Sequence, residues 1–78
     1  MKILCFGIAK EIIGTSEYQV TDTGITTVKA LKSSLLENFS EFNQYKKFRI
    51  AVNQAFAEDE DLIKDTDEIA IIPPVSGG

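Results

Sequence analysis

The sequence predicts an α+β fold, in which one main helix packs on one face of a mixed sheet of four to five strands. One stretch, residues 27–39, has apolar residues at helical spacing, and short segments rich in β-branched and aromatic residues lie before and after it. With 78 residues the chain has room for a single domain. We expect this domain to cover residues 1–72 and an extended tail to follow at residues 73–78.

The first two strands are expected before the helix. Residues 2–9 are apolar almost without interruption, as in a central strand that is covered on both faces. A turn or short helical piece closed by Gly14 follows, and residues 17–21 then alternate like an edge strand. These segments predict a hairpin-like unit at the start of the chain.

The helix is expected to begin after Gly24, with the hydroxyl group of Thr26 or Thr27 as its N-cap. The apolar residues that recur at helical spacing are Val28, Leu31, Leu35 and Phe39. They form one stripe, which predicts that one side of the helix is buried against the sheet.

Three further strands are expected after the helix. A polar connection at residues 40–47 comes first, and the aromatic rings of Phe42, Tyr45 and Phe48 are expected to cover an edge of the core. Asn53-Gln54 predicts a tight turn, because Asn tolerates a positive φ. The strands are expected at residues 49–52, 55–57 and 68–72, and the last one ends at two prolines, which have no amide proton to donate.

The resulting order, β-β-α-β-β-β, is that of a ubiquitin-like β-grasp, with the first and last strands side by side in the middle of the sheet. Side chains alternate between the two faces of a strand, so the residues expected to face the helix are Ile3, Cys5, Ile69 and Ile71. The opposite face is expected to carry an apolar patch formed by Leu4, Phe6, Ala70 and Ile72. Such a patch favours docking of another protein, unless the polar connection covers it.

Charge and composition exclude several kinds of site in this chain. Lys and Arg total 8 against 12 for Asp and Glu, a net charge of -4, which disfavours nucleic acid and anionic membranes as partners. No histidine is present and Cys5 is the one cysteine, which excludes an internal disulfide, a Cys/His zinc site and a Ser-His or Cys-His nucleophile. No apolar segment is long enough to span a membrane, so the expected location is the cytoplasm.

Two further features are interpreted as structural and not as sites. Cys5 is expected to be a small core residue without chemistry. The acidic run at residues 58–61 lacks the spacing of a calcium-binding loop, so a solvated surface is expected there and no metal site.

The chain ends in Gly77 and Gly78, and a terminus without Cβ atoms is slim enough to enter a narrow cleft on another protein. The reactive group would be the carboxylate of Gly78. A carboxylate is a poor acyl donor, but ATP can convert it to an acyl adenylate, from which sulfur or an amine displaces AMP. Partner proteins would then supply positioning and electrostatic stabilisation. The alternative is a frayed polar terminus.

Two motifs carry a resemblance to a known family. They are Ala51-Val52-Asn53-Gln54 and the ending Asp67-Glu68-Ile69-Ala70-Ile71-Ile72-Pro73-Pro74-Val75-Ser76-Gly77-Gly78, and weaker matches at 3–6, 9–15 and 27–31 extend the similarity over almost the whole chain. The sequence resembles the small, sulfur-carrying subunit of molybdopterin synthase, in the ubiquitin-like group that also contains the thiamine sulfur carrier. It departs at Thr66, where the family often has Gly; a β-branched residue there predicts a turn without positive φ.

The resemblance implies a sulfur carrier that is not an enzyme on its own and that binds no permanent cofactor. An activating enzyme would adenylate Gly78 with ATP, and a sulfur donor protein would convert it to a thiocarboxylate. The tail would enter the large synthase subunit, where sulfur passes to cyclic pyranopterin monophosphate to build the dithiolene of molybdopterin, for molybdenum cofactor biosynthesis. The family also implies a heterotetramer around a dimer of large subunits.

The expected site residues follow from the tail, from the apolar patch and from a basic position that many relatives share, here Lys10. Gly78 is the reacting residue, and Gly77 keeps the end of the tail narrow because it has no Cβ. The residues expected to bind the partner proteins are Leu4, Phe6, Lys10, Ala70, Ile72, Pro73, Pro74, Val75 and Ser76.

Three alternatives stay open. The chain could carry sulfur for thiamine or another metabolite, which the large partner that co-purifies with it would reveal. It could be a protein modifier joined through Gly78 to lysines, which predicts conjugates of higher mass. It could also be a plain β-grasp interaction module whose tail is inert.

Overall fold

The computed structural model describes residues 1–21, 24–44 and 48–73. Predictions for Tyr45 and for the tail residues Pro74, Val75, Ser76, Gly77 and Gly78 lie outside the described residues. The elements in chain order are β1 (Lys2–Cys5), α1 (Gly7–Ile13), β2 (Glu17–Gln19), α2 (Val28–Asn38), the 3-10 helix η1 (Ser40–Gln44), β3 (Arg49–Val52), β4 (Ala55–Phe56) and β5 (Ile69–Ile72).

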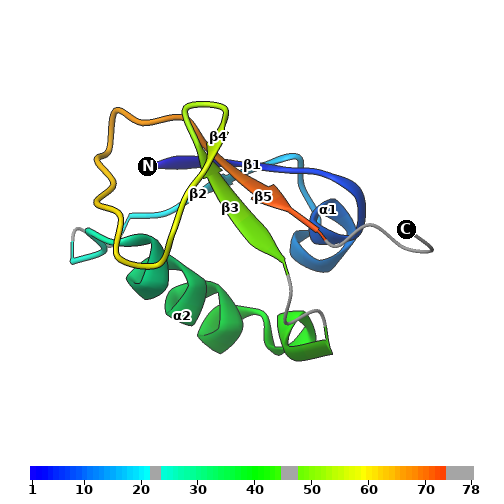
Figure 1. Cartoon of the computed structure of the whole chain (residues 1–78). Helices are drawn as coiled ribbons and strands as arrows, with labels where there is room; N and C mark the ends of the chain where they lie inside the picture. Colours follow the sequence, from blue (N-terminus) through cyan, green and yellow to red (C-terminus); the bar gives the residue numbers. More distant parts are fainter. Residues whose placement is uncertain (22–23, 45–47, 74–78) are drawn as a thin grey trace.

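The five strands form one mixed sheet in the order β2-β1-β5-β3-β4, and α2 lies along one face of it (Figure 1). β1 and β5 pair in parallel in the middle of the sheet, with Leu4 opposite Ala70, and all other neighbouring strands pair antiparallel. The predicted α+β fold, a ubiquitin-like β-grasp with the first and last strands side by side, is therefore confirmed.

The segment after β1 differs from the single strand predicted for residues 2–9. β1 ends at Cys5, and Gly7 begins α1 with a φ of 53°, a left-handed conformation that turns the chain out of the sheet. α1 ends at Gly14, which has a φ of 90° and donates its amide to the carbonyl of Lys10 at 2.8 Å. The helical piece closed by Gly14 is confirmed, but its start was wrong, because a short apolar run does not distinguish strand from helix.

Replacing Gly14 with alanine is expected to lower the free energy of unfolding by about 1 kcal/mol, because a residue with a Cβ is disfavoured in a left-handed conformation. No described atom beyond its chain neighbours lies within 4 Å of a Cβ placed on Gly14, so the cost is conformational and not a steric clash. Urea unfolding measures the change, with Glu11→Ala on exposed helix surface as the control. Equal stability of Gly14→Ala and the wild type would contradict the prediction.

The start of α2 is fully capped. The hydroxyl of Thr27 accepts a hydrogen bond from the amide of Ala30 at 3.1 Å, which confirms Thr27 as the N-cap. The carbonyl groups of Asp61 and Asp59 accept from the first two amides of the helix, each at 3.0 Å. The acidic run at residues 58–61 therefore has a structural role through its backbone, in addition to the solvated surface that the sequence predicts.

The core lies between α2 and the sheet. The residues predicted to face the helix are all at most 2% exposed, and these are Ile3, Cys5, Ile69 and Ile71. Phe42 of η1 is 1% exposed, and its ring centroid lies 5.1 Å from that of Phe48. These aromatic rings are part of the core itself, whereas the sequence predicted that they only cover its edge.

Candidate functional site: the open face of the sheet

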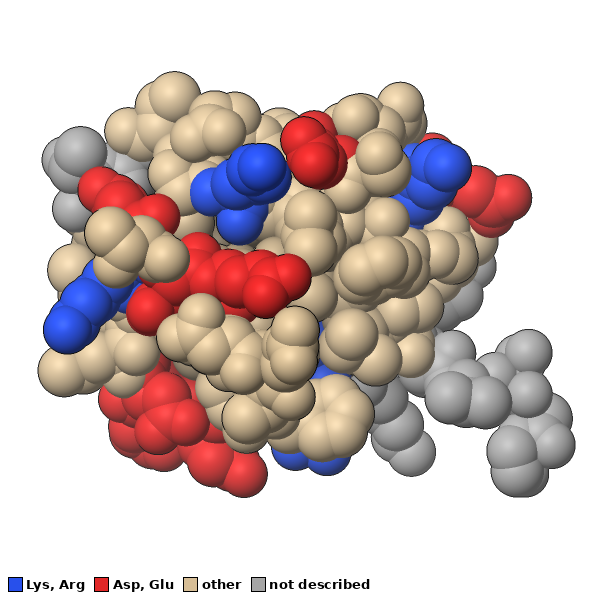
Figure 2. All heavy atoms as spheres, turned by 90° about the horizontal axis from the view of Figure 1, so that it is seen from above, with Lys and Arg blue, Asp and Glu red and all other residues tan. Residues whose placement is uncertain are grey.

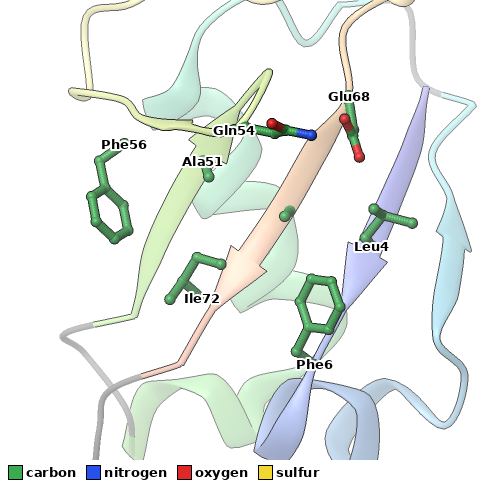
Figure 3. A pocket seen from close by; sticks show the side chains of 8 residues that line it. Leu4, Phe6, Ala51, Gln54, Phe56, Glu68 and Ile72 are labelled. Carbon is green, nitrogen blue, oxygen red and sulfur yellow. The ribbon is translucent and has the colours of Figure 1, made fainter.

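The face of the sheet opposite α2 is apolar and open. Figure 2 looks onto this face and shows uncharged residues to the right of its centre, whereas acidic side chains gather mainly on the left and reach the centre. The face is hollowed by about 360 Å³, and the residues that line this outer hollow are Leu4, Phe6, Ala51, Gln54, Phe56, Glu68, Ala70 and Ile72. The predicted patch of Leu4, Phe6, Ala70 and Ile72 is thus brought together on one surface (Figure 3).

The described part of the polar connection does not cover this hollow, since η1 packs against α1 and α2. Large apolar side chains therefore remain in contact with water: Phe6 is 51% exposed and Phe56 is 59% exposed. Contiguous apolar surface of this kind is typical of a protein interaction site.

Four lining residues were missed from the sequence, namely Ala51, Gln54, Phe56 and Glu68. The pairing of β3 with β5 and β4 brings them beside the predicted patch, with Ala51 opposite both Ala70 and Phe56. The guanidinium carbon of Arg49 lies 4.1 Å from the centroid of the Phe56 ring, so this ring has a cationic neighbour. The alternation of side chains along the strand predicted at residues 49–52 could have placed Ala51 on this face.

The predicted tail begins at the edge of the hollow. Ile72 lines the hollow and ends β5, and the half-buried Pro73 follows it. A Cβ placed on Gly7 would lie 3.5 Å from Cγ of Pro73, so the start of α1 lies against the residue where the tail begins. A distance of 3.5 Å is an ordinary van der Waals contact, so the left-handed φ of Gly7 and not close packing is what favours glycine at this position. Lys10 is exposed on α1 and is not among the residues that line the hollow.

At the opposite end of the hollow, Asn53 connects the turn between β3 and β4 to the residues just before β5. Its side-chain amide donates to the Asp67 carboxylate at 3.1 Å, and its side-chain oxygen accepts from the Glu68 amide at 3.0 Å. Its own amide donates to the Glu68 carbonyl at 2.8 Å. The two motifs that carried the family resemblance are thus bonded to each other. Thr66, in the adjacent turn, has no positive φ, as predicted.

We expect acid to destabilise the protein partly through Asp67. Hydrogen bonds from the Lys64 amide at 2.8 Å and from the Asn53 side chain lower the pKa of the Asp67 carboxyl group. Because the folded-state pKa is below the unfolded-state value of about 4, the stabilisation is complete above that value and is lost as the pH falls through the folded-state pKa.

The Asp67→Asn variant should therefore lose less of its stability than the wild type between about pH 5 and pH 2. The measurement is the urea midpoint as a function of pH. Asp65→Asn is the matched control, because the Asp65 side chain makes no hydrogen bond among the described residues. Parallel pH profiles for wild type and Asp67→Asn would contradict the assignment.

Cys5 and the acidic side chains were the other groups of the sequence that could have formed a site. Cys5 is buried, and burial raises the pKa of its thiol, which disfavours the reactive thiolate. Within residues 1–21, 24–44 and 48–73, no group of three or more Cys, Asp or Glu side chains is arranged to hold a metal ion. No helix in the described part of the chain has the length and apolar character needed to cross a membrane.

Comparison with known protein families gives a match over residues 3–78, nearly the whole chain, to the model described as the ThiS family. The chain belongs to the ThiS family. The molybdopterin synthase sulfur carrier subunit of Caenorhabditis elegans is 34% identical to this ThiS-family chain over 82 residues, covering 100% of this chain and 96% of the relative. The subunit of the same name from Dictyostelium discoideum is 37% identical over 84 residues, covering 99% and 94%. The resemblance to the molybdopterin synthase sulfur carrier subunits is therefore confirmed.

Solved structures give the same fold for this ThiS-family chain. The small archaeal modifier protein 1 from Methanosarcina acetivorans is 27% identical with a TM-score of 0.78, covering 99% of this chain and 94% of the other. A protein-protein complex of subunits 1 and 2 of the molybdopterin-converting factor from Helicobacter pylori contains a chain with a TM-score of 0.66 and 24% identity, covering 99% and 96%.

Proposed function

We propose that this protein is the sulfur carrier subunit of a molybdopterin synthase. The observation that carries the proposal is the similarity over the whole chain to sulfur carrier subunits, together with the Gly77-Gly78 ending. The protein contributes the reacting carboxylate and no catalytic residue of its own. The catalytic groups come from the large synthase subunit and from the activating enzyme.

In the proposed reaction, a carboxylate oxygen of Gly78 attacks the α-phosphorus of ATP, and pyrophosphate leaves. The terminal sulfur of a persulfide on the donor protein then attacks the carbonyl carbon of the acyl adenylate, and AMP leaves. A thiol reduces the resulting acyl disulfide, which gives the thiocarboxylate and a disulfide. In the synthase, the sulfur of this group bonds to cyclic pyranopterin monophosphate, and water then attacks the carbonyl carbon of the resulting thioester, which leaves the sulfur on the pterin and regenerates the carboxylate. ATP is therefore a co-substrate of the activating enzyme and not a bound cofactor of this chain.

The test is the intact mass of the protein after incubation with the activating enzyme of its host, ATP and a sulfur source. Exchange of one oxygen for sulfur is expected, and its absence when ATP is omitted is the control. An unchanged mass, with an activating enzyme that loads another carrier under the same conditions, would overturn the proposal. A loaded protein that transfers no sulfur to the pyranopterin precursor in the presence of the large subunit would instead indicate another pathway, such as thiamine synthesis.

The proposal includes docking of the large subunit on the outer hollow, beside the start of the tail. Ile72→Glu is expected to weaken this complex about a hundredfold or more, because docking would bury an unpaired carboxylate against Leu4 and Phe6. Calorimetric titration measures the Kd. Ser33→Glu places the same charge on exposed surface of α2 and should leave the Kd unchanged. Equal Kd values for Ile72→Glu and the wild type would rule out docking on this face.

A second candidate function is protein modification through Gly78, which the 27% identity to an archaeal modifier protein favours. In this function an amine of a target lysine, and not sulfur, displaces AMP from the adenylate. Expression of a tagged protein in its host would then give conjugates of higher mass that are absent for a variant lacking Gly78. We expect no such conjugates if the protein serves only as a sulfur carrier.

A further inference from the structure

The turn between β3 and β4 contains a residue type that its backbone disfavours. Asn53 and Gln54 connect the two strands, with φ values of 52° and 70°. Two-residue turns with positive φ at both positions prefer Asn followed by Gly, because Gly has no Cβ to clash. A long side chain such as that of Gln54 is an outlier in this conformation, and an outlier of this kind calls for a reason outside the turn.

The fold itself makes no use of the Gln54 side chain or of the Glu68 carboxylate. Among the described residues neither group makes a hydrogen bond or an ion pair. The charged residues nearest Glu68 are Lys2, Asp65 and Asp67, which line a second hollow together with it. Asp67 accepts two hydrogen bonds, and Lys2 lies 3.8 Å from the carboxylate of Glu17 and makes no ion pair with Glu68. Gln54 and Glu68 are therefore free to bind something outside this chain.

Both side chains lie at the same end of the outer hollow. Figure 3 shows the amide group of Gln54 directed toward the Glu68 carboxylate, while Phe6 and Ile72 lie at the other end. Glu68 is the one charged residue among those that line the hollow, and the remaining lining residues apart from Gln54 are apolar. The hollow is thus an apolar surface with one polar end that carries one negative charge.

This arrangement limits what can cover the hollow. A protein that docks on the apolar residues removes water from Glu68, and an unpaired carboxylate in that position is costly. A guanidinium group compensates the charge, because it is a planar donor that serves a carboxylate and an amide oxygen at the same time. The stem of an arginine can also lie along Leu4 and Ala70, which line the same hollow.

We propose that Gln54 and Glu68 together receive an arginine side chain of the protein that docks on this face. The inference rests on the proposed function for the identity of that protein, the large synthase subunit. Gln54 acts as a specificity residue: in Figure 3 its amide nitrogen faces Glu68, and a half-turn of the terminal amide places the oxygen beside the carboxylate to accept from the guanidinium, at the cost of a disfavoured backbone conformation in the turn.

The test measures the Kd of the large subunit of the same host for four variants of the full chain, together with their melting temperatures. Glu68→Gln is expected to weaken binding about tenfold or more and to reduce its dependence on salt. Gln54→Gly is expected to weaken binding while raising the melting temperature, since it removes a residue unsuited to the turn. Asp65→Asn is the matched loss of charge outside the hollow, and Ile72→Glu reports on docking itself.

A double-mutant cycle identifies the residue that the partner contributes. Each arginine on the surface of the large subunit is replaced with alanine, and at least one replacement should lose its effect in the Glu68→Gln background. Weakening of Glu68→Gln that is coupled to no arginine would overturn the proposal, as would an effect of Asp65→Asn equal to that of Glu68→Gln.

The remaining outcomes separate the inference from the proposed function. If Ile72→Glu abolishes binding while Glu68→Gln and Gln54→Gly bind like the wild type, docking on this face stands and the arginine site is overturned. If the wild type does not bind the large subunit at all, both the proposed function and the inference built on it are overturned.

Discussion

Deletion of Gly78 is expected to abolish sulfur loading completely and to leave the stability of the protein unchanged. The shortened chain still ends in a glycine carboxylate, but its reacting carbon lies one residue, about 3.5 Å, short of the position that the activating enzyme holds for adenylation. A displacement far smaller than this already costs about a hundredfold in rate. The measurement is again the intact mass after incubation with ATP and a sulfur source.

Two controls separate chemistry from folding. The buried hydrophobic residues of the described chain lie between Met1 and Ile71, so the urea midpoint of the deletion variant should equal that of the wild type. One alanine added after Gly78 should block loading equally, because the new carboxylate is displaced in the opposite direction. Sulfur gained by the shortened chain would show that loading does not occur at Gly78.

Replacing Ile71 with alanine is expected to lower the free energy of unfolding by about 2–5 kcal/mol. Ile71 is 0% exposed and lies on β5, between Cys5 on one side and Ile50 on the other, so the lost atoms leave a cavity that the sheet cannot close. A domain of this size has a total stability of only about 4–12 kcal/mol. The variant should therefore lose a large part of its stability.

The neighbouring residue provides the matched control for this prediction. Ile72 has the same side chain on the same strand but lies on the opposite face, where it is only half-buried and lines the outer hollow. Ile72→Ala should lower the free energy of unfolding by less than Ile71→Ala does, because the Ile72 side chain borders the open hollow and its removal leaves no enclosed cavity. Urea unfolding of both variants measures the difference. Equal destabilisation by the two substitutions would contradict the assignment of the two faces.

The sequence by itself determined the elements in which local chemistry and burial agree. Four apolar residues at helical spacing and the hydroxyl of Thr27 specified α2 to within one residue at each end. Alternation in β1 and β5 separated the buried isoleucines from the residues of the open face, because successive side chains of a strand point to opposite sides. The motif ending in Gly77-Gly78 identified the family, since this similarity requires no knowledge of contacts.

Only the tertiary structure decided the features that depend on residues far apart in the chain. The start of α1 was wrong in the sequence prediction because the apolar run is equally suited to strand and helix, and the positive φ of Gly7 decides between them. The acidic run caps α2 through carbonyl groups, which every residue type possesses, so no side-chain pattern marks this role. Gln54 and Glu68 lie at one end of the hollow because β3 and β5 pair just before them and after them in the chain, and that pairing joins residues 17 to 23 positions apart.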